Sequence, residues 1–305
     1  MTDLATRPTE SEHRTRNGMA VAISVAAGIL LAILWSFEFV DSVIGDNVAN
    51  TLLGYEAKAT PIAGTGAGLV FAFVSGFAGT FTACNIAMAA SIGPMSQAGA
   101  GSRTDALRAL ARPLGAFTLA MVSVSAVYGF VGVLLGARLP QLSTDMVGSV
   151  PVRLIQSSVV FGVVGLAMVY LGLAALGVVR DVFAGRPTAR VVALGALVGA
   201  FLIGRPYPMF VKLFHWAADT GNPLYGAATF ALQSIGNILI VSLVFALLVL
   251  VTRGGFLRWL SGSPRRLALV SGTLLLALGV FTVVYWDVRV PSLFGIGWFP
   301  TMPYK

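Results

Sequence analysis

Long apolar runs without charge alternate with short polar segments along the whole chain. Each run is long enough to cross a bilayer core of about 30 Å as a helix that rises about 1.5 Å per residue. Only helices and closed barrels satisfy the backbone in lipid, and barrel strands would alternate over about 10 residues, so the runs predict helices. The seven predicted spans are 19–40, 66–95, 114–136, 156–179, 191–217, 225–252 and 267–286.

The first apolar run, residues 19–40, stands where a secretory signal peptide would stand. A signal-peptide core has about 7–15 apolar residues and ends in a small-residue cleavage site, and no such site follows Trp35. We therefore expect an uncleaved anchor, preceded by a polar, disordered leader over residues 1–18. The aromatic- and proline-rich tail, residues 287–305, either lies at the membrane interface or docks an extracytoplasmic partner.

Lysine and arginine are concentrated in every second polar segment, thirteen in one set against five in the other. Basic residues flank apolar spans on the cytoplasmic side, so the N-terminus is predicted to be cytoplasmic and the C-terminus extracytoplasmic, in the cell membrane. Charged residues make up only 10% of the chain, where soluble domains carry about 25%. The net charge of +8 therefore indicates membrane topology and a lipid bilayer as partner, not nucleic acid.

The six spans after the anchor divide into two halves of three, 66–179 and 191–286. With three crossings each, the halves enter the membrane from opposite sides, as inverted repeats do. The predicted fold is thus an all-α polytopic membrane protein, an anchor followed by a 3+3 inverted repeat over 66–286. The first span of each half is interrupted, and matching interruptions point to a central binding site. The predicted breaks are Gly93 and Pro94 in the first half and Gly204, Pro206 and Pro208 in the second.

Arg205 lies near the middle of the predicted span 191–217, where a charge costs about 2.5–3.5 kcal/mol. The prolines on either side of Tyr207 prevent a regular helix, so the freed carbonyls must face protein or water. Lys212 would share a face with Arg205 if the helix resumes after Pro208. These residues predict a cationic lining for a path from midplane to the outer surface. Alternatively Lys212, with His215 and Asp219, extends to the outer interface.

Cys84 is the only cysteine and lies in a 44-residue stretch without charge, Ala59 to Ser102. Free cysteines are often buried and behave as small hydrophobes. Asn85 next to it favours a polar site instead, because an amide at membrane depth needs partners. A nearby cation such as Arg205 would favour the thiolate and make Cys84 a candidate redox thiol.

Several kinds of chemistry are excluded. One cysteine forms no intramolecular disulfide and no multi-cysteine zinc site. The chain has no P-loop, no H-E-x-x-H motif and no carboxylate pair in the spans, so we expect no metal and no cofactor. Gln233 and Asn237, four apart in the sixth span, are predicted to form hydrogen bonds between helices.

Two segments resemble the CcdA/DsbD transmembrane family: FVSGFAGTFTACNIAMAASIGPM and the stretch from GALVGAFLIGRPYPMFVKLFHWAADTGNP onwards. The resemblance covers roughly residues 66–286. It implies two inverted three-helix halves, each opening with a helix that bears a proline-associated cysteine. It also implies transfer of reducing equivalents across the membrane to thioredoxin-like or cytochrome c maturation proteins.

The chain departs from that family at both cysteine positions. Cys84 matches the first, but Ala83 replaces the preceding proline, and the second position falls at about Tyr207. Three hypotheses follow. The protein transfers electrons through Cys84 and a partner thiol, which would make it a thiol-disulfide oxidoreductase in cytochrome c biogenesis. It transports a small solute past Arg205. Or it is a non-catalytic membrane subunit of a respiratory or cytochrome assembly.

Overall fold

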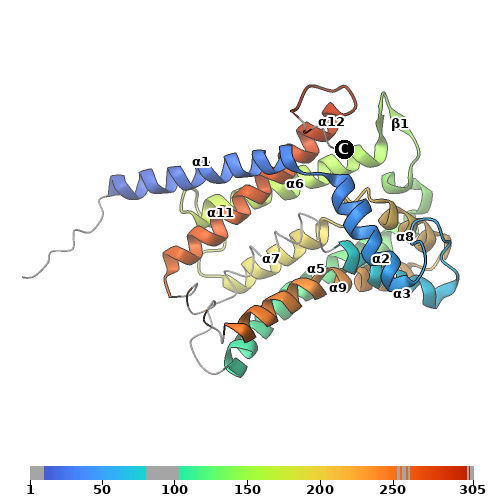
Figure 1. The fold of residues 1–305 in the computed structure, drawn as a ribbon, viewed down its shortest axis with the longest axis horizontal. Helices are drawn as coiled ribbons and strands as arrows, with labels where there is room; N and C mark the ends of the chain where they lie inside the picture. Colours follow the sequence, from blue (N-terminus) through green and yellow to red (C-terminus); the bar gives the residue numbers. More distant parts are fainter. Residues whose placement is uncertain are drawn as a thin grey trace, which may run out of the picture.

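The computed structural model describes residues 10–79, 103–252, 255, 259, 262–300 and 302, and these are almost entirely helical (Figure 1). The longer helices are α1 (Glu10–Leu34), α3 (Gly64–Ala78), α5 (Arg103–Leu135), α6 (Val152–Ala175), α7 (Pro187–Ala200), α9 (Pro223–Val251) and α11 (Pro264–Val283). The shorter elements are η1 (Phe39–Gly45), α2 (Asp46–Leu53), η4 (Gly136–Arg138), η5 (Pro140–Leu142), α8 (Pro208–Asp219), η6 (Val284–Arg289) and α12 (Val290–Ser292). One short antiparallel ribbon pairs β1 (Met146–Val147) with β2 (Val150–Pro151).

Four helical stretches within the described residues are long and apolar enough to cross a membrane. They are Asn17–Leu34, Ala111–Leu135, Val152–Ala175 and Pro264–Ser292. The prediction of an all-helical fold with helices long and apolar enough to cross a membrane is therefore confirmed. By contrast, α3 and α7, which open the two predicted halves, have only 15 and 14 residues. Within the described residues, both helices are shorter than a bilayer core requires.

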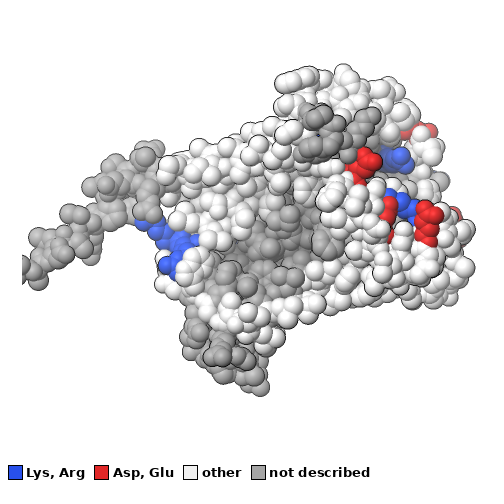
Figure 2. Space-filling model, viewed as in Figure 1, with Lys and Arg blue, Asp and Glu red and all other residues white. Residues whose placement is uncertain are grey.

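The outward faces of the long helices are apolar. On α6, Val159, Val163 and Leu166 recur at helical spacing and are 61%, 63% and 60% exposed. An exposed stripe of this kind is suited to lipid rather than water. Figure 2 shows the charged side chains of the visible face toward the two ends of the molecule, and the described surface between them carries none.

Glycines bring the helices into close contact. A Cβ added at Gly172 of α6 would lie 2.9 Å from the carbonyl oxygen of Gly272 in α11, and one at Gly279 would lie 2.8 Å from that of Gly165. Helix α5 crosses α9 where Gly129 meets the carbonyl of Gly226. Small residues at such crossings allow the backbones to approach, which is how helices associate in lipid.

The N-terminal helix differs at both ends from the predicted anchor, residues 19–40. It begins at Glu10, so residues 10–18 of the expected disordered leader are helical. It ends at Leu34, and the non-helical residues Trp35 and Ser36 separate it from the helical turn that leads into the π-helical η1. Arg289 of η6 fixes this end by donating to the carbonyls of Ala32 and Trp35, both at 2.6 Å. The segment 39–53 thus folds over one end of the bundle, next to α3 and α8 (Figure 1).

Candidate ligand site at the break between α7 and α8

The predicted span 191–217 is divided into two helices in the structure. Helix α7 ends at Ala200, and α8 begins only at Pro208. Neither Pro206 nor Pro208 has an N–H to offer a helical hydrogen bond. Arg205 and Tyr207 therefore lie on an irregular segment between two helix ends, which is tolerated at membrane depth only where protein or water surrounds it.

Two glutamine side chains satisfy the carbonyls that this break releases. Gln156, at the start of α6, donates from its amide nitrogen to the carbonyl of Ile203 at 2.9 Å. Gln141 of η5 donates to the carbonyl of Arg205. Gly204 packs against the ring of Phe161, where an added Cβ would lie 3.0 Å from the ring carbons. The break is therefore a packed, hydrogen-bonded structure.

The side chain of Arg205 is directed toward the end of α3 and the middle of α9. The residue is 3% exposed, and its Nη2 donates to the side-chain oxygen of Asn237 in α9 at 3.5 Å. Its Nη1 lies 3.0 Å from where a Cβ at Gly79 would stand, so a side chain at this end of α3 would require the guanidinium to shift. The guanidinium brings a positive charge with several planar N–H donors into the site.

A cavity of about 480 Å³, counting its open mouth, lies beside this guanidinium. Its polar wall is formed by Asp41, Ser75, Arg205, Tyr207 and Gln233. Its apolar wall includes Trp35, Phe37, Met209 and Phe210. Residues far apart in sequence thus meet at one place: the link after α1, the end of α3, the α7–α8 break and the middle of α9. Apolar walls with a few converging polar groups are typical of small-molecule sites.

Gln233 lines this cavity and carries an unsatisfied acceptor. The residue is 1% exposed, and its amide nitrogen donates to Ser75 Oγ at 3.2 Å. Ser75 in turn donates its own hydroxyl to the carbonyl of Ala72 at 3.0 Å, so it must accept from Gln233. That fixes the orientation of the amide. Its Oε1 is buried with no hydrogen-bond partner among the described residues.

An ion cluster lies at the end of the site formed by η1 and α2. Lys58 contacts Asp41 at 2.9 Å and Asp46 at 2.7 Å. Burial raises the pKa of Asp41 above its ordinary value, and the Lys58 ammonium offsets only part of that increase. For Lys58, burial acts to lower the pKa, but the two carboxylates outweigh it and raise the pKa above its ordinary value.

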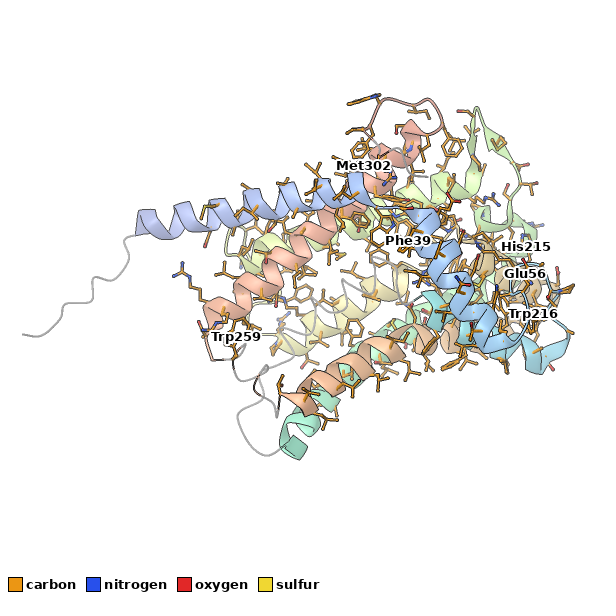
Figure 3. All side chains as sticks on the ribbon, viewed as in Figure 1. Phe39, Glu56, His215, Trp216, Trp259 and Met302 are labelled. Carbon is orange, nitrogen blue, oxygen red and sulfur yellow. The ribbon has the colours of Figure 1, made fainter. Side chains whose placement is uncertain are left out.

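Lys212 of α8 lies apart from the cavity wall, although its spacing from Arg205 predicted a shared face. Its ammonium donates to the carbonyls of Ala57 at 2.6 Å and Lys58 at 3.2 Å, and to that of Thr60. It therefore ties the loop after α2 to α8. His215 is exposed at the same end of the molecule, near Glu56 and Trp216 (Figure 3), and so is Asp219.

The other predicted site residues divide into two groups. Tyr207 lines the cavity and stacks on Phe37, with ring centroids 5.1 Å apart and an angle of 15° between the planes. The candidate thiol and its neighbours, Cys84, Asn85, Gly93 and Pro94, lie outside the described residues. Within the described part of the chain, no group of three or more His, Cys, Asp or Glu side chains could hold a metal ion.

Gln141 and Ser75 contribute to the site without any mark in the sequence. Gln141 stands alone in a loop between predicted spans, and no periodic pattern identifies such a residue. Ser75 lies in an apolar, glycine-rich run where a small hydroxyl is common. The amide of Gln233 did stand out in its span, and it proves to contact α3 as well as the cavity.

The fold and the site define an all-helical protein with helices of membrane-spanning length and a buried arginine beside a cavity on a broken helix. Comparisons with protein-family models, with curated proteins and with solved structures found no match.

Proposed function

We propose that this chain is a seven-span membrane protein whose two inverted halves enclose the cavity at Arg205, and that it transports a small anionic solute. The observation that carries the proposal is the position of Arg205: 3% exposed, on a broken helix, at the wall of a cavity. Ionisable groups at membrane depth are expensive and usually mark a substrate path.

The contacts between helices support the inverted repeat. If the helices of the two halves are matched in order, α3 corresponds to α7, α5 to α9 and α6 to α11. Under this correspondence the contact between α3 and α9 has its equivalent in the contact between α7 and α5. The contacts between α5 and α9 and between α6 and α11 are their own equivalents. The glycines at the α6–α11 crossing repeat in the same way, since Gly165 and Gly172 have the same spacing as Gly272 and Gly279. A repeat related by a two-fold axis would produce this pattern.

The count of seven spans combines the four membrane-length helices with three further crossings. In this proposal α9, with 29 residues, crosses by itself, and α7 crosses together with the break and α8. Helix α3 opens the remaining crossing. Broken helices of this kind form the substrate site in many transporters, because the interruption provides polar backbone and side chains at midplane.

Flux measurements in proteoliposomes test the proposal. Uptake of nitrate, acetate and lactate would be compared between the parent, Arg205→Ala and Lys212→Ala. Loss of a charged hydrogen-bond donor from a buried site should reduce flux of the transported anion at least about tenfold in Arg205→Ala. Lys212→Ala removes a cation of similar size outside the cavity wall and should retain most of the flux. If Arg205→Ala transports every anion as well as the parent does, the proposed function is wrong.

Thiol–disulfide transfer of the CcdA/DsbD type is a second candidate, favoured by one contact. Gly79, which precedes Cys84 by five residues, lies against the guanidinium of Arg205. Since five residues extend at most about 18 Å, Cys84 stays within that distance of Gly79. A neighbouring cation favours a thiolate.

In this second candidate the Cys84 thiolate attacks the disulfide of a thioredoxin-like or cytochrome c maturation protein. A mixed disulfide forms, and the other partner sulfur leaves as a thiolate. Trapping in cells, followed by non-reducing electrophoresis, should then show a high-mass adduct that disappears in Cys84→Ser and on reduction. Identical patterns in parent and Cys84→Ser would rule this candidate out.

A further inference from the structure

We infer that the cavity at Arg205 selects a small carboxylate that also carries a hydroxyl or ammonium donor beside the carboxylate. The inference rests on the proposed function and narrows its anionic solute to hydroxy- and amino-carboxylates. Two groups in the same wall carry it: the guanidinium of Arg205 and the unsatisfied Oε1 of Gln233.

Arg205 defines the anionic part of the ligand. A guanidinium presents parallel N–H donors in a plane, and a carboxylate offers two oxygens at matching separation. The remaining walls favour an organic anion over an inorganic one. Trp35, Phe37 and Phe210 line the cavity, and an apolar ligand body would bury its surface against them.

Gln233 defines the donor part. Its amide nitrogen already donates to Ser75, so the remaining polar atom of the side chain, Oε1, can only accept a hydrogen bond. A buried acceptor without a donor is unfavourable, and a ligand with an O–H or N–H would satisfy it. A site that hydrogen-bonds such a group also discriminates against analogues that lack it.

Asp41 is a second group in the cavity lining that favours a ligand with a hydrogen-bond donor. Its carboxylate lines the cavity, while the one ammonium it contacts, Lys58, is shared with Asp46. Asp41 therefore adds a carboxyl group to the same lining as the guanidinium of Arg205. A cation and an acidic group in one cavity are suited to a ligand that carries an acceptor at one end and a donor at the other.

Binding to the full chain in lipid nanodiscs tests the inference with three matched probes. Propionate, L-lactate and L-alanine share a three-carbon carboxylate, ionised at pH 7, and differ in having no donor, a hydroxyl or an ammonium group. Calorimetric titration of the parent should give at least about tenfold tighter binding of lactate or alanine than of propionate. A preference for lactate alone assigns the donor as hydroxyl, and one for alanine alone assigns it as ammonium.

Two variants test whether Gln233 causes the tighter binding of the donor-bearing probes. Gln233→Met keeps the length of the side chain but removes the acceptor, so the difference between the donor-bearing probe and propionate should disappear. Thr229→Val is the matched control, since Thr229 is a buried polar residue on α9, one turn before Gln233, and does not line the cavity. It should keep the preference of the parent. Unfolding midpoints of both proteins would be recorded first.

The inference is overturned if propionate binds the parent as tightly as both donor-bearing probes, or if none of the three binds. It is also overturned if Gln233→Met keeps the tenfold difference. The parent measurement needs no variant, so a variant that fails to fold leaves the test intact. Anion flux that depends on Arg205 but is equal for propionate and lactate would reject this inference while leaving the proposed transport function standing.

Discussion

Gln141 donates its side-chain amide to the backbone carbonyl of Arg205, across 64 residues of sequence. Gln156 does the same for Ile203, so two amides from outside the broken segment replace hydrogen bonds that a continuous helix would have made. The backbone of Arg205 is therefore held by Gln141 while its side chain reaches Asn237. The position of the guanidinium depends on residues that do not contact the cavity themselves.

Replacing Gln141 by leucine should destabilise the protein. The carbonyl of Arg205 would lose this hydrogen bond while buried, which costs about 1–3 kcal/mol. For a chain of this size, about 1 kcal/mol lowers the unfolding midpoint by about 2–4 °C. Thermal unfolding in detergent checks the shift. Thr144→Ala, at an exposed position in the same loop, serves as the control and should change the midpoint by less than about 1 °C. Equal midpoints for Gln141→Leu and the control would show that the hydrogen bond contributes nothing.

Alanine at the α6–α11 crossing should destabilise the bundle, whereas alanine at another helical glycine should not. In Gly279→Ala the new Cβ would lie 2.7 Å from the backbone nitrogen of Val169, so the helices must separate. Overpacking of this kind costs about 1–3 kcal/mol. Gly115 of α5 has nothing within 4 Å of an added Cβ, and Gly115→Ala should stabilise the helix by up to about 1 kcal/mol. The expected result is a lower unfolding midpoint than the parent for Gly279→Ala and a higher one for Gly115→Ala. A decrease in both variants would mean that the crossing is not what limits stability.

The broken helix was predictable from sequence, but its supports were not. Pro206 and Pro208 mark a break by local chemistry alone, because neither has a backbone N–H. Gln141 supports that break from a loop 64 residues earlier, and only the tertiary fold brings the two together. The end of α1 likewise coincides with tertiary contacts that the local sequence does not show. Apolar residues continue through Phe39 and Val40, so hydropathy extends the anchor to residue 40, while contacts with Arg289 accompany its end at Leu34.

The cavity itself was only half predictable. Arg205 and Tyr207 stood out as a charge and a polar aromatic beside prolines, and both line it. Asp41 and Trp35 belong to the link after α1, which hydropathy assigned to the outer end of an anchor. Asp41 and Trp35 lie next to the break because η1 and α2 fold back over it. The sequence does not predict this, since a π-helix of seven residues has no recognisable periodic pattern.

The ion cluster at Lys58 should make stability depend on pH in the alkaline range. The folded-state pKa of Lys58 is raised above that of the unfolded chain, so the ammonium contributes stability that is complete below about pH 10.5. That contribution disappears as the pH rises through the folded-state pKa. The parent should therefore be more stable than Lys58→Met by about 1 kcal/mol at pH 8, and the difference should shrink above pH 10.5.

Thermal unfolding of both proteins from pH 8 to pH 12 measures that difference. Arg138→Met removes an exposed cation elsewhere, and arginine does not titrate in this range, so its difference from the parent should stay constant. A Lys58→Met difference that is equally constant would contradict the pKa shift.

Single-cysteine labelling should distinguish seven crossings from four, because Cys84→Ser provides a background without cysteine. Glu56, Ala184 and Met302 are exposed positions, and in Figure 3 Glu56 lies at the end of the molecule opposite Trp259. With a cytoplasmic N-terminus, seven crossings place Glu56 and Met302 outside and Ala184 inside. If only the four membrane-length helices crossed, Ala184 would be outside and Met302 inside. In intact cells a membrane-impermeant maleimide should therefore label Glu56→Cys and Met302→Cys, and should label Ala184→Cys only after permeabilisation. If Ala184→Cys is labelled in intact cells and Met302→Cys is not, the chain crosses the membrane four times and the proposed inverted repeat is wrong.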